Sequence, residues 1–186
     1  MIVDLGPTDR RLLEAAARLL AEGLPQGWPT RREARREVEE MVDPGRIARG
    51  FVEEGELVGW AGALELYPNH VWELHPLVVR GDRRRQGVGR SLVRDVEEQV
   101  RRRGAHTLFV GTDDEFGETA IGEVELYPDV IGHLQRLQAS GEASEHPFAF
   151  YRRLGYSLIG AVPDANGRGR PDILLARRLV DGTGRD

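Results

Sequence analysis

The apolar residues near the start of the chain recur at intervals of three and four, which is the spacing of one face of a helix. This pattern predicts a helix capped by Thr8 or Asp9, after a short strand over 2–5. A loop rich in Gly and Pro, over 23–29, is expected to end that helix. The chain is therefore predicted to begin with a strand, a helix and a loop.

A second helix is predicted over 31–41, with Thr30 as its cap. Most of its residues are charged, and Glu33 and Glu37 are within reach of Arg side chains on the same helix. Such a pattern is typical of a helix face that contacts only solvent. We therefore interpret this charged face as plain solvated surface.

The remaining elements alternate between strand and helix patterns, separated by turns rich in Gly, Pro, Asn and Asp. Their order favours an α/β fold, with one mixed sheet and helices on both of its faces, over an alternating parallel barrel. The predicted elements are strands over 47–52 and 57–66 joined by a turn at 54–56, a strand over 71–79, a helix over 89–103, a strand over 107–111, a polar insertion over 112–145 with a short helix near 130–137, a helix beginning at Pro147, and strands over 156–162 and 172–179.

The length of 186 residues fits one domain, which we place at 1–180, followed by a frayed tail over 181–186. No stretch approaches the roughly 20 apolar residues of a membrane helix. The first residues lack the basic leader and apolar stretch of a secretory signal. We therefore expect a cytoplasmic protein with no membrane partner.

The basic residues other than His number 26, and all of them are Arg; Lys and Cys are absent. Without Lys there is no Schiff base and no phosphate-loop lysine. Without Cys there is no disulfide, thiolate nucleophile or zinc ribbon. The formal net charge of −5 argues against a dedicated nucleic-acid binder and is compatible with a cationic ligand.

A segment of Arg and Gly residues over 83–90, Arg-Arg-Arg-Gln-Gly-Val-Gly-Arg, joins a predicted strand to a predicted amphipathic helix. Its Gly residues let the backbone approach a ligand, and the free N–H groups of a first helical turn favour a phosphate. The three leading Arg residues can pair with further phosphates. A dinucleotide fingerprint is disfavoured, because Leu92 stands where its third small residue belongs. The other interpretation is an exposed basic turn.

Glu73 and His75 lie two residues apart in one predicted strand, so their side chains project from the same face. Such a pair can remove a proton from an ammonium group. The alternatives are a structural histidine and a carboxylate paired with an arginine. The other His residues have no ligand spacing with this pair, so no metal is expected. Pro76 lacks an N–H, which predicts a bulge or splay that turns the amides of Leu77 and Val79 toward a ligand.

Two further features fit either chemistry or ordinary structure. Tyr151 lies near the start of the last predicted helix, where a phenol either donates a proton to a leaving group or fills the core. Acidic residues gather in the insertion, where they form either a solvated loop or a wall that attracts a cation. These acids are Asp113, Asp114, Glu115, Glu118, Glu123 and Glu125.

Together these features resemble the GNAT N-acetyltransferases, which use acetyl-coenzyme A. The general likeness rests on a strand, the sequence Arg84-x-x-Gly87-x-Gly89, a helix, and Phe-Tyr-x-x-Leu-Gly-Tyr over 150–156. The resemblance is closer to the aminoglycoside 6′-N-acetyltransferases of the enterococcal type. It is carried by Trp-Glu-Leu-His-Pro-Leu-Val-Val over 72–79, Gly-Thr-Asp-Asp over 111–114, Leu-Tyr over 126–127, Glu-His-Pro over 145–147 and Pro-Asp-Ala-Asn-Gly over 163–167.

The resemblance implies the GNAT fold, with its sheet splayed at the cofactor site. It implies transfer of the acetyl group of acetyl-CoA to the 6′-amino group of an aminoglycoside, by direct attack in a ternary complex and with no metal. It also implies a homodimer and a link to antibiotic resistance. A polycationic substrate agrees with the acidic insertion, because opposite charges attract across a binding surface.

Residue by residue, the resemblance implies that Glu73, directly or through water and with His75, takes the proton of the substrate ammonium. Tyr151 would protonate the departing thiolate, and the amides at Leu77 would polarise the thioester carbonyl. The implied cofactor-binding residues are Leu77, Val78, Val79, Arg84, Arg85, Gln86, Gly87, Val88, Gly89 and Arg90. The implied substrate-binding residues are Trp28, Tyr67, Glu73, Asp113, Asp114, Glu125 and Glu145.

The chain departs from the enterococcal enzymes at two places. The segment over 128–145 is a few residues longer, and Phe116 stands where those enzymes carry a further acid. Two alternatives stay open: a GNAT acetyltransferase for another small amine or a protein N-terminus, and a non-catalytic CoA-binding module. The acids over 112–127 argue against a peptide substrate, and the joint presence of Glu73, His75 and Tyr151 argues against a pure binder.

Overall fold

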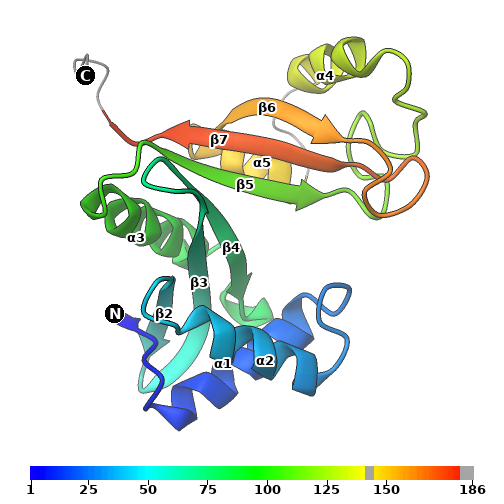
Figure 1. Ribbon diagram of the computed structural model, residues 1–186. Coiled ribbons are helices and arrows are strands. Elements are labelled where there is room, and N and C mark those ends of the chain that lie inside the picture. Colours follow the sequence, from blue (N-terminus) through cyan, green and yellow to red (C-terminus); the bar gives the residue numbers. More distant parts are fainter. Residues whose placement is uncertain (141–144, 181–186) are drawn as a thin grey trace. The chain divides into compact units, whose positions relative to one another are not determined.

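The computed structural model describes residues 1–140 and 145–180 (Figure 1). The chain divides into two compact units, Phe109–Arg178 and the residues on either side of that segment. The predicted tail over 181–186, and residues 141–144 of the longer insertion, lie outside the described residues. One domain over 1–180 stays a prediction. No helix of the described ranges is long and apolar enough to cross a membrane.

The first unit contains a sheet in which the strands follow the order β1-β2-β3-β4, each antiparallel to its neighbour. The predicted hairpin between β2 and β3 is confirmed, with Glu54 and Gly55 at positive φ in its turn. The elements are β1 (Ile2–Asp4), α1 (Arg10–Gly23), α2 (Arg31–Met41), β2 (Ile47–Glu53), β3 (Glu56–Tyr67), β4 (Val71–Val79), the 3₁₀ turn η1 (Gly81–Arg83) and α3 (Val88–Arg102).

Both early helices begin at side-chain caps. Asp9 caps α1, because its carboxylate accepts a hydrogen bond from the Leu12 amide at 3.1 Å. Thr30 caps α2 in a capping box, in which Thr30 accepts from the Glu33 amide and Glu33 accepts from the Thr30 amide. The prediction of Thr30 is therefore confirmed, and Asp9 is the cap among the two candidates for α1.

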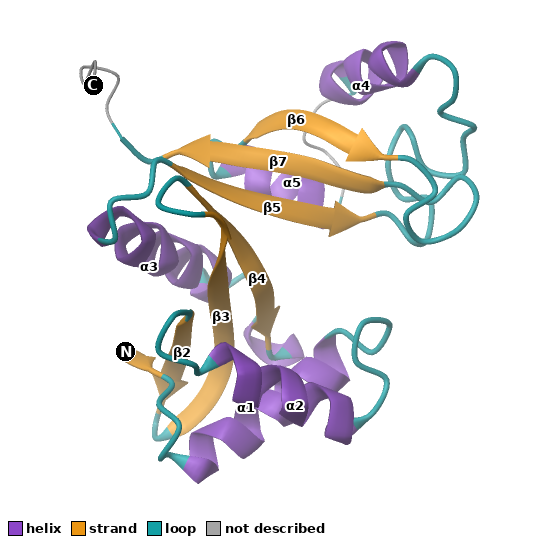
Figure 2. Ribbon diagram, in the orientation of Figure 1, coloured by secondary structure: helices purple, strands orange, loops and turns teal. Residues whose placement is uncertain are grey.

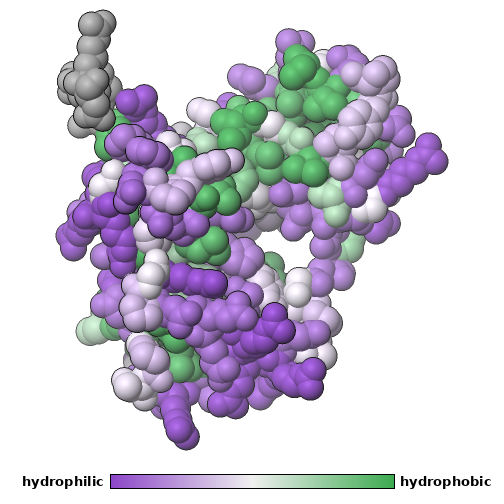
Figure 3. All heavy atoms as spheres, in the orientation of Figure 1, coloured by the Kyte–Doolittle hydropathy of each residue, from purple (hydrophilic) through white to green (hydrophobic). Residues whose placement is uncertain are grey.

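Helices cover both faces of this sheet (Figure 2). Trp60 in β3 is fully buried toward α1, where its indole donates to the Ala16 carbonyl at 3.1 Å. The neighbouring residue Gly59 faces α3, because a Cβ there would lie 3.3 Å from Val88. Since successive strand residues point to opposite faces, α1 and α3 pack on opposite sides. The outward faces of α1 and α2 are covered by hydrophilic side chains (Figure 3).

A bulge interrupts the pairing of β3 with β4. Ala63 lies opposite Leu74, whereas Ala61 lies opposite Leu77, so β4 carries one extra residue at His75–Pro76. The predicted bulge at Pro76 is therefore confirmed. The two partners Ala61 and Ala63 share a face, so the bulge brings Leu74 and Leu77 to that same face despite their odd spacing.

The second unit is a smaller sheet with the strand order β5-β7-β6, in which β6 and β7 are antiparallel. The Thr112 hydroxyl donates to the Ile173 carbonyl at 3.1 Å, and Phe148 and Ala149 of the last helix are buried. The insertion contains its predicted short helix. The elements are β5 (Thr107–Asp113), which begins in the first unit, α4 (Val130–Ala139), α5 (Pro147–Arg153), β6 (Ser157–Val162) and β7 (Asp172–Arg178).

We expect Gly62→Ala to destabilise the protein by about 1–3 kcal/mol, because a methyl group at this point of the bulge has no room. Its Cβ would lie 2.6 Å from the His75 carbonyl oxygen and 2.4 Å from the Met41 methyl group. Urea unfolding measures the effect. Gly45→Ala is the matched control, since nothing lies within 4 Å of a Cβ there. Equal stability of both variants would contradict the packing at Gly62.

Candidate active site

Glu73 and His75 share one face of β4, the face that α1 and α2 cover. Glu73 lies opposite Leu64 on β3, and Leu64 packs against the core formed with these helices. His75 is on the same side, because its Nε2 lies 3.5 Å from a carboxylate oxygen of Glu37 on α2. The structure therefore brings this pair together as the spacing predicts. Beyond the bulge, Leu77 and Val79 lie on the opposite face, toward α3.

Trp28, Glu37 and His75 form a connected cluster. The Trp28 indole donates a hydrogen bond to the second carboxylate oxygen of Glu37 at 3.3 Å. The Trp28 and His75 rings are tilted by 52°, with centroids 5.5 Å apart. Trp28 is one of the predicted substrate-binding residues, and the structure places it beside His75. Tyr67, another of them, is exposed at the end of β3.

The interpretation of the α2 face as plain solvent surface is wrong for Glu37, whose side chain is only 19% exposed. Glu33 belongs to the capping box, while Arg36 pairs with Glu40 instead of Glu37. A sequence signal for Glu37 did exist. It stands three residues after Ala34 and four before Met41, so it lies within the buried stripe of the helix.

The His75 imidazole lowers the pKa of the Glu37 carboxyl below its ordinary value of 4.5, with help from Trp28 and Arg46 and against the effect of partial burial. Because the pKa of Glu37 is lower in the folded protein, its ionised carboxylate stabilises the fold at pH values above the ordinary pKa of 4.5. That contribution disappears as the pH falls through the folded-state pKa.

Glu37→Gln is accordingly expected to lower the free energy of unfolding by about 1 kcal/mol at pH 7, through loss of charge-assisted contacts. The deficit should shrink as the pH falls below 4.5 and the wild-type carboxylate becomes protonated. Urea unfolding across this range gives the comparison. Glu40→Gln on the exposed side of α2 is the control and should stay within about 0.5 kcal/mol. A deficit for Glu37→Gln that does not change with pH would rule out the carboxylate as its cause.

The turn before α3 leaves the first amides of that helix available to an anion. Gly87 is the N-cap residue, with φ of 87°, and no described side chain caps the helix at this end. The first helical hydrogen bond runs from the Ser91 amide to the Gly87 carbonyl at 3.0 Å, so the amides of 88–90 precede it. The first turn contains no acidic residue, and a Cβ at Gly87 would meet open space. This end of the helix therefore fits a phosphate or pyrophosphate group.

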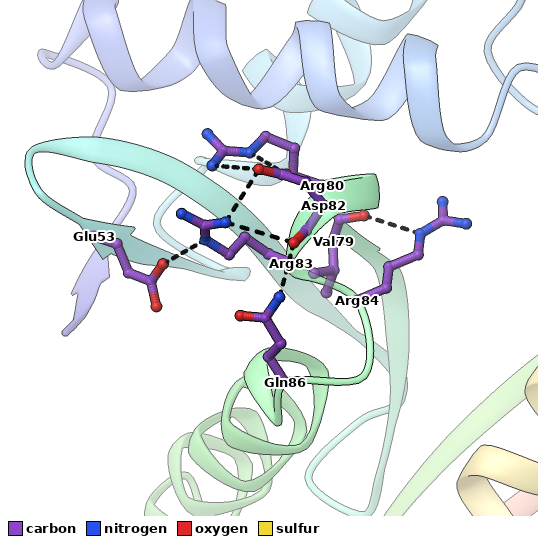
Figure 4. Close-up of polar contacts among 7 residues, drawn as sticks. All are labelled: Glu53, Val79, Arg80, Asp82, Arg83, Arg84 and Gln86. Atoms are coloured by element: carbon purple, nitrogen blue, oxygen red, sulfur yellow. Dashed lines mark hydrogen bonds and ion pairs between the residues drawn. The ribbon is translucent and has the colours of Figure 1, made fainter.

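The arginines of this segment differ in their availability (Figure 4). Arg83 donates to Glu53 at 2.9 Å and to Asp82 at 3.2 Å, so the expectation that it pairs with a phosphate is not supported. Arg84 donates from Nε to the Val79 carbonyl at 3.3 Å. Asp82, which sequence reasoning missed, binds Arg83 through its carboxylate and the Gln86 amide group through its carbonyl, and so fixes the shape of the turn.

In the second unit, Tyr151 is 4% exposed and lies within α5. Its ring packs edge-on against Phe150 and Tyr156, with centroids 5.0 and 5.4 Å away. Burial raises the pKa of the Tyr151 phenol above its ordinary value, so the hydroxyl keeps its proton at neutral pH. A protonated phenol is the form that can donate to a leaving group.

His146, the central residue of the Glu-His-Pro sequence, has a structural role at the start of α5. Its ring is buried and caps α5, because Nδ1 accepts a hydrogen bond from the Phe148 amide at 3.1 Å. Its Nε2 lies 2.9 Å from the Asp113 carbonyl oxygen, which can only accept, so the proton is on Nε2. This imidazole therefore connects the helix that carries Tyr151 to the end of β5. Sequence reasoning gave it no such role.

The acidic residues of the insertion differ in burial and in hydrogen bonding. Asp114 is fully buried and accepts hydrogen bonds from the Glu118 amide and from the amide and hydroxyl of Thr119. Asp114 thus organises the loop and is not part of an exposed wall. Asp113 is exposed and accepts from the Asn166 amide group at 2.6 Å.

The other predicted acids of this unit are at the surface. Glu125 accepts from the Tyr127 amide at 3.2 Å and lies 3.7 Å from the Arg168 guanidinium. Glu145 is exposed at the start of the segment that leads into α5. Partial burial, and then the Asp113 carboxylate, raise the pKa of Glu115. The surface acids therefore make this part of the loop attractive to a cation.

The sequence profile described as "Acetyltransferase (GNAT) family" matches residues 13–126. An aminoglycoside 6′-N-acetyltransferase solved with coenzyme A is 35% identical, with a TM-score of 0.90 and 99% of each chain covered. The aminoglycoside 6′-N-acetyltransferase from Enterococcus faecium is 34% identical, with a TM-score of 0.88 and the same coverage. An aminoglycoside 6′-acetyltransferase type Ii is also 34% identical, with a TM-score of 0.75, over 97% of this chain and 98% of that one.

Among curated protein sequences, none matches the chain. The ribosomal-protein-S18-alanine N-acetyltransferase from Escherichia coli is 17% identical with a TM-score of 0.65, over 100% of this chain and 98% of that one, a likeness that shows only a shared fold. The predicted mixed α/β fold and the resemblance to the GNAT acetyltransferases are confirmed by these matches.

Proposed function

The chain belongs to the GNAT acetyltransferase family, and we propose that it transfers the acetyl group of acetyl-CoA to the 6′-amino group of an aminoglycoside. The observation that carries this proposal is the similarity, over nearly the full length of both chains, to proteins described as aminoglycoside 6′-N-acetyltransferases. One of them was solved with coenzyme A, which supports acetyl-CoA as the donor. The homodimer and the cytoplasmic location stay predictions.

The turn before α3 suits the donor. The free amides of Val88, Gly89 and Arg90 would hold the pyrophosphate of acetyl-CoA, and Gly87 would allow its close approach. The backbone of β4 at Leu77 and Val79 would bind the pantetheine arm and polarise the thioester carbonyl. Acetyl-CoA supplies an activated acetyl group, so the chain has only to bind, orient and move protons.

Two side chains are suited to proton transfer. The Glu73 side chain has no hydrogen bond or ion pair with any described residue, so its carboxylate is available to take a proton from the substrate ammonium, with His75 beside it. As the new C–N bond forms and the C–S bond breaks, the buried phenol of Tyr151 would donate a proton to the sulfur. Direct transfer agrees with a chain that contains no Cys nucleophile.

The exposed acids Asp113, Glu125 and Glu145 would attract the several ammonium groups of an aminoglycoside. In this proposal Asp114 holds the loop and does not touch the substrate. The same acids suit another small polyamine, which is the second candidate substrate class.

A thiol-release assay with kanamycin, acetyl-CoA and purified protein tests the substrate. We expect turnover with kanamycin and weaker turnover with simple polyamines or peptides. Binding of CoA, measured by calorimetry, serves as the control for a functional donor site. No turnover with any aminoglycoside, despite measurable CoA binding, would refute the proposed substrate.

Glu73→Gln is expected to reduce kcat by about 10²–10⁴-fold, the usual contribution of a general base. The loss should be greatest at low pH, where little of the substrate amine is free without a base to deprotonate it. Rates measured from pH 6 to 9 give the comparison. Glu56→Gln, at the exposed start of β3, is the control. A pH profile identical to that of the wild type would remove Glu73 from the role of base.

A further inference from the structure

Glu37 bridges two side chains that belong to the candidate site. One carboxylate oxygen lies 3.5 Å from His75 Nε2, and the other accepts the indole hydrogen bond of Trp28 at 3.3 Å. Trp28 lies in a loop, Glu37 in a helix and His75 in a strand. The contacts among them therefore come from the tertiary fold and not from closeness in the sequence. The carboxylate is the only group that touches both rings through hydrogen-bonding atoms among the described residues.

The position of Glu37 is fixed by the helix that carries it. Ala34, Val38 and Met41 are fully or almost fully buried, and they flank Glu37 along one face of α2. The capping box at Thr30 fixes the first turn of the same helix. The packing of α2 therefore holds the backbone of Glu37 in place, and the side chain reaches both rings from that position.

A carboxylate with a depressed pKa is ionised at neutral pH, and an ionised carboxylate only accepts hydrogen bonds. The nitrogen of a neutral imidazole that faces it must therefore carry the proton, and the other nitrogen must be the acceptor. Because Nε2 faces Glu37, the acceptor is Nδ1. The Trp28 indole only donates, and it binds the other carboxylate oxygen, so it leaves the oxygen that faces His75 to the imidazole.

We propose that Glu37 is a positioning residue, which holds the His75 imidazole with Nε2 protonated and leaves Nδ1 to accept a proton, directly or through water. The orientation follows from the contacts above. Its use in proton transfer from the substrate amine rests on the proposed function. Two further charged groups influence Glu37 and His75. They are Arg46, which follows α2, and Glu73, which lies on the same face of β4 as His75.

Imidazole ¹⁵N chemical shifts of the full-length protein at neutral pH test the orientation, with His75→Asn used to assign the signals. In the wild type we expect one tautomer, with Nε2 protonated. Glu37→Gln keeps the size of the side chain but can donate as well as accept, so the tautomers should mix. Glu37→Leu removes the acceptor and should give a mixture as well. Glu40→Gln is the control on the same helix and should match the wild type.

Kinetics test the consequence. Glu37→Gln should lower kcat on the order of 10-fold, because part of the His75 population presents the wrong nitrogen, and leave the KM for acetyl-CoA unchanged. A tautomer that is the same in the wild type and in both Glu37 variants would overturn the proposal. Mixed tautomers with an unchanged kcat would overturn the role in proton transfer.

The NMR result is independent of turnover. If the wild type acetylates no aminoglycoside or other amine, the proposed function fails. The tautomer measurement then still decides whether Glu37 positions His75.

Discussion

The extra residue of β4 at His75–Pro76 is the constraint on which the arrangement of the first unit depends. Before the bulge, Glu73 and His75 point toward α1 and α2; after it, Leu77 and Val79 point toward α3. Without the extra residue, strict alternation would put all four side chains on one face. The bulge thus lets one short strand present Glu73 and His75, the proposed proton-transfer groups, on one side and the side chains of Leu77 and Val79 on the other. Gly62 makes this possible, because only a residue without Cβ fits against the His75 carbonyl.

Charge in the first unit is organised locally. The arginine-rich turn contains its own counter-charges, since Asp82 holds Arg80 and Arg83, and Glu53 also binds Arg83. Exposed ion pairs of this kind add little stability, but together they limit the conformations of a loop. The phosphate site that we propose there would then depend chiefly on the uncapped amides of α3, whose direction is fixed by the backbone. An anion site built this way requires no lysine.

Sequence patterns predicted those features that depend on neighbouring residues. Thr30 as a cap, the Glu54–Gly55 turn and the bulge at Pro76 all follow from local backbone chemistry. The roles of Glu37 and Asp114 could not be predicted with the same ease, because a carboxylate has the same local signature whether its partner is water or a buried group. Spacing gave a partial signal for Glu37, which lies in the buried stripe of α2. For Asp114, no periodicity distinguishes a loop organiser from a surface acid.

Several of the segments proposed to act in catalysis are held by a polar side chain that bonds to a neighbouring element or to the turn around it. Glu37 does this for the Trp28 loop, Asp82 for the turn before α3, Asp114 for the start of the insertion, and His146 for α5. Loops lack the repeated hydrogen bonds of a sheet or helix, so their shape must come from such contacts. A buried acceptor that loses its donors costs about 1–3 kcal/mol, enough to select one loop conformation over its alternatives. These polar contacts therefore fix the shape of the segments from which the proposed site is built.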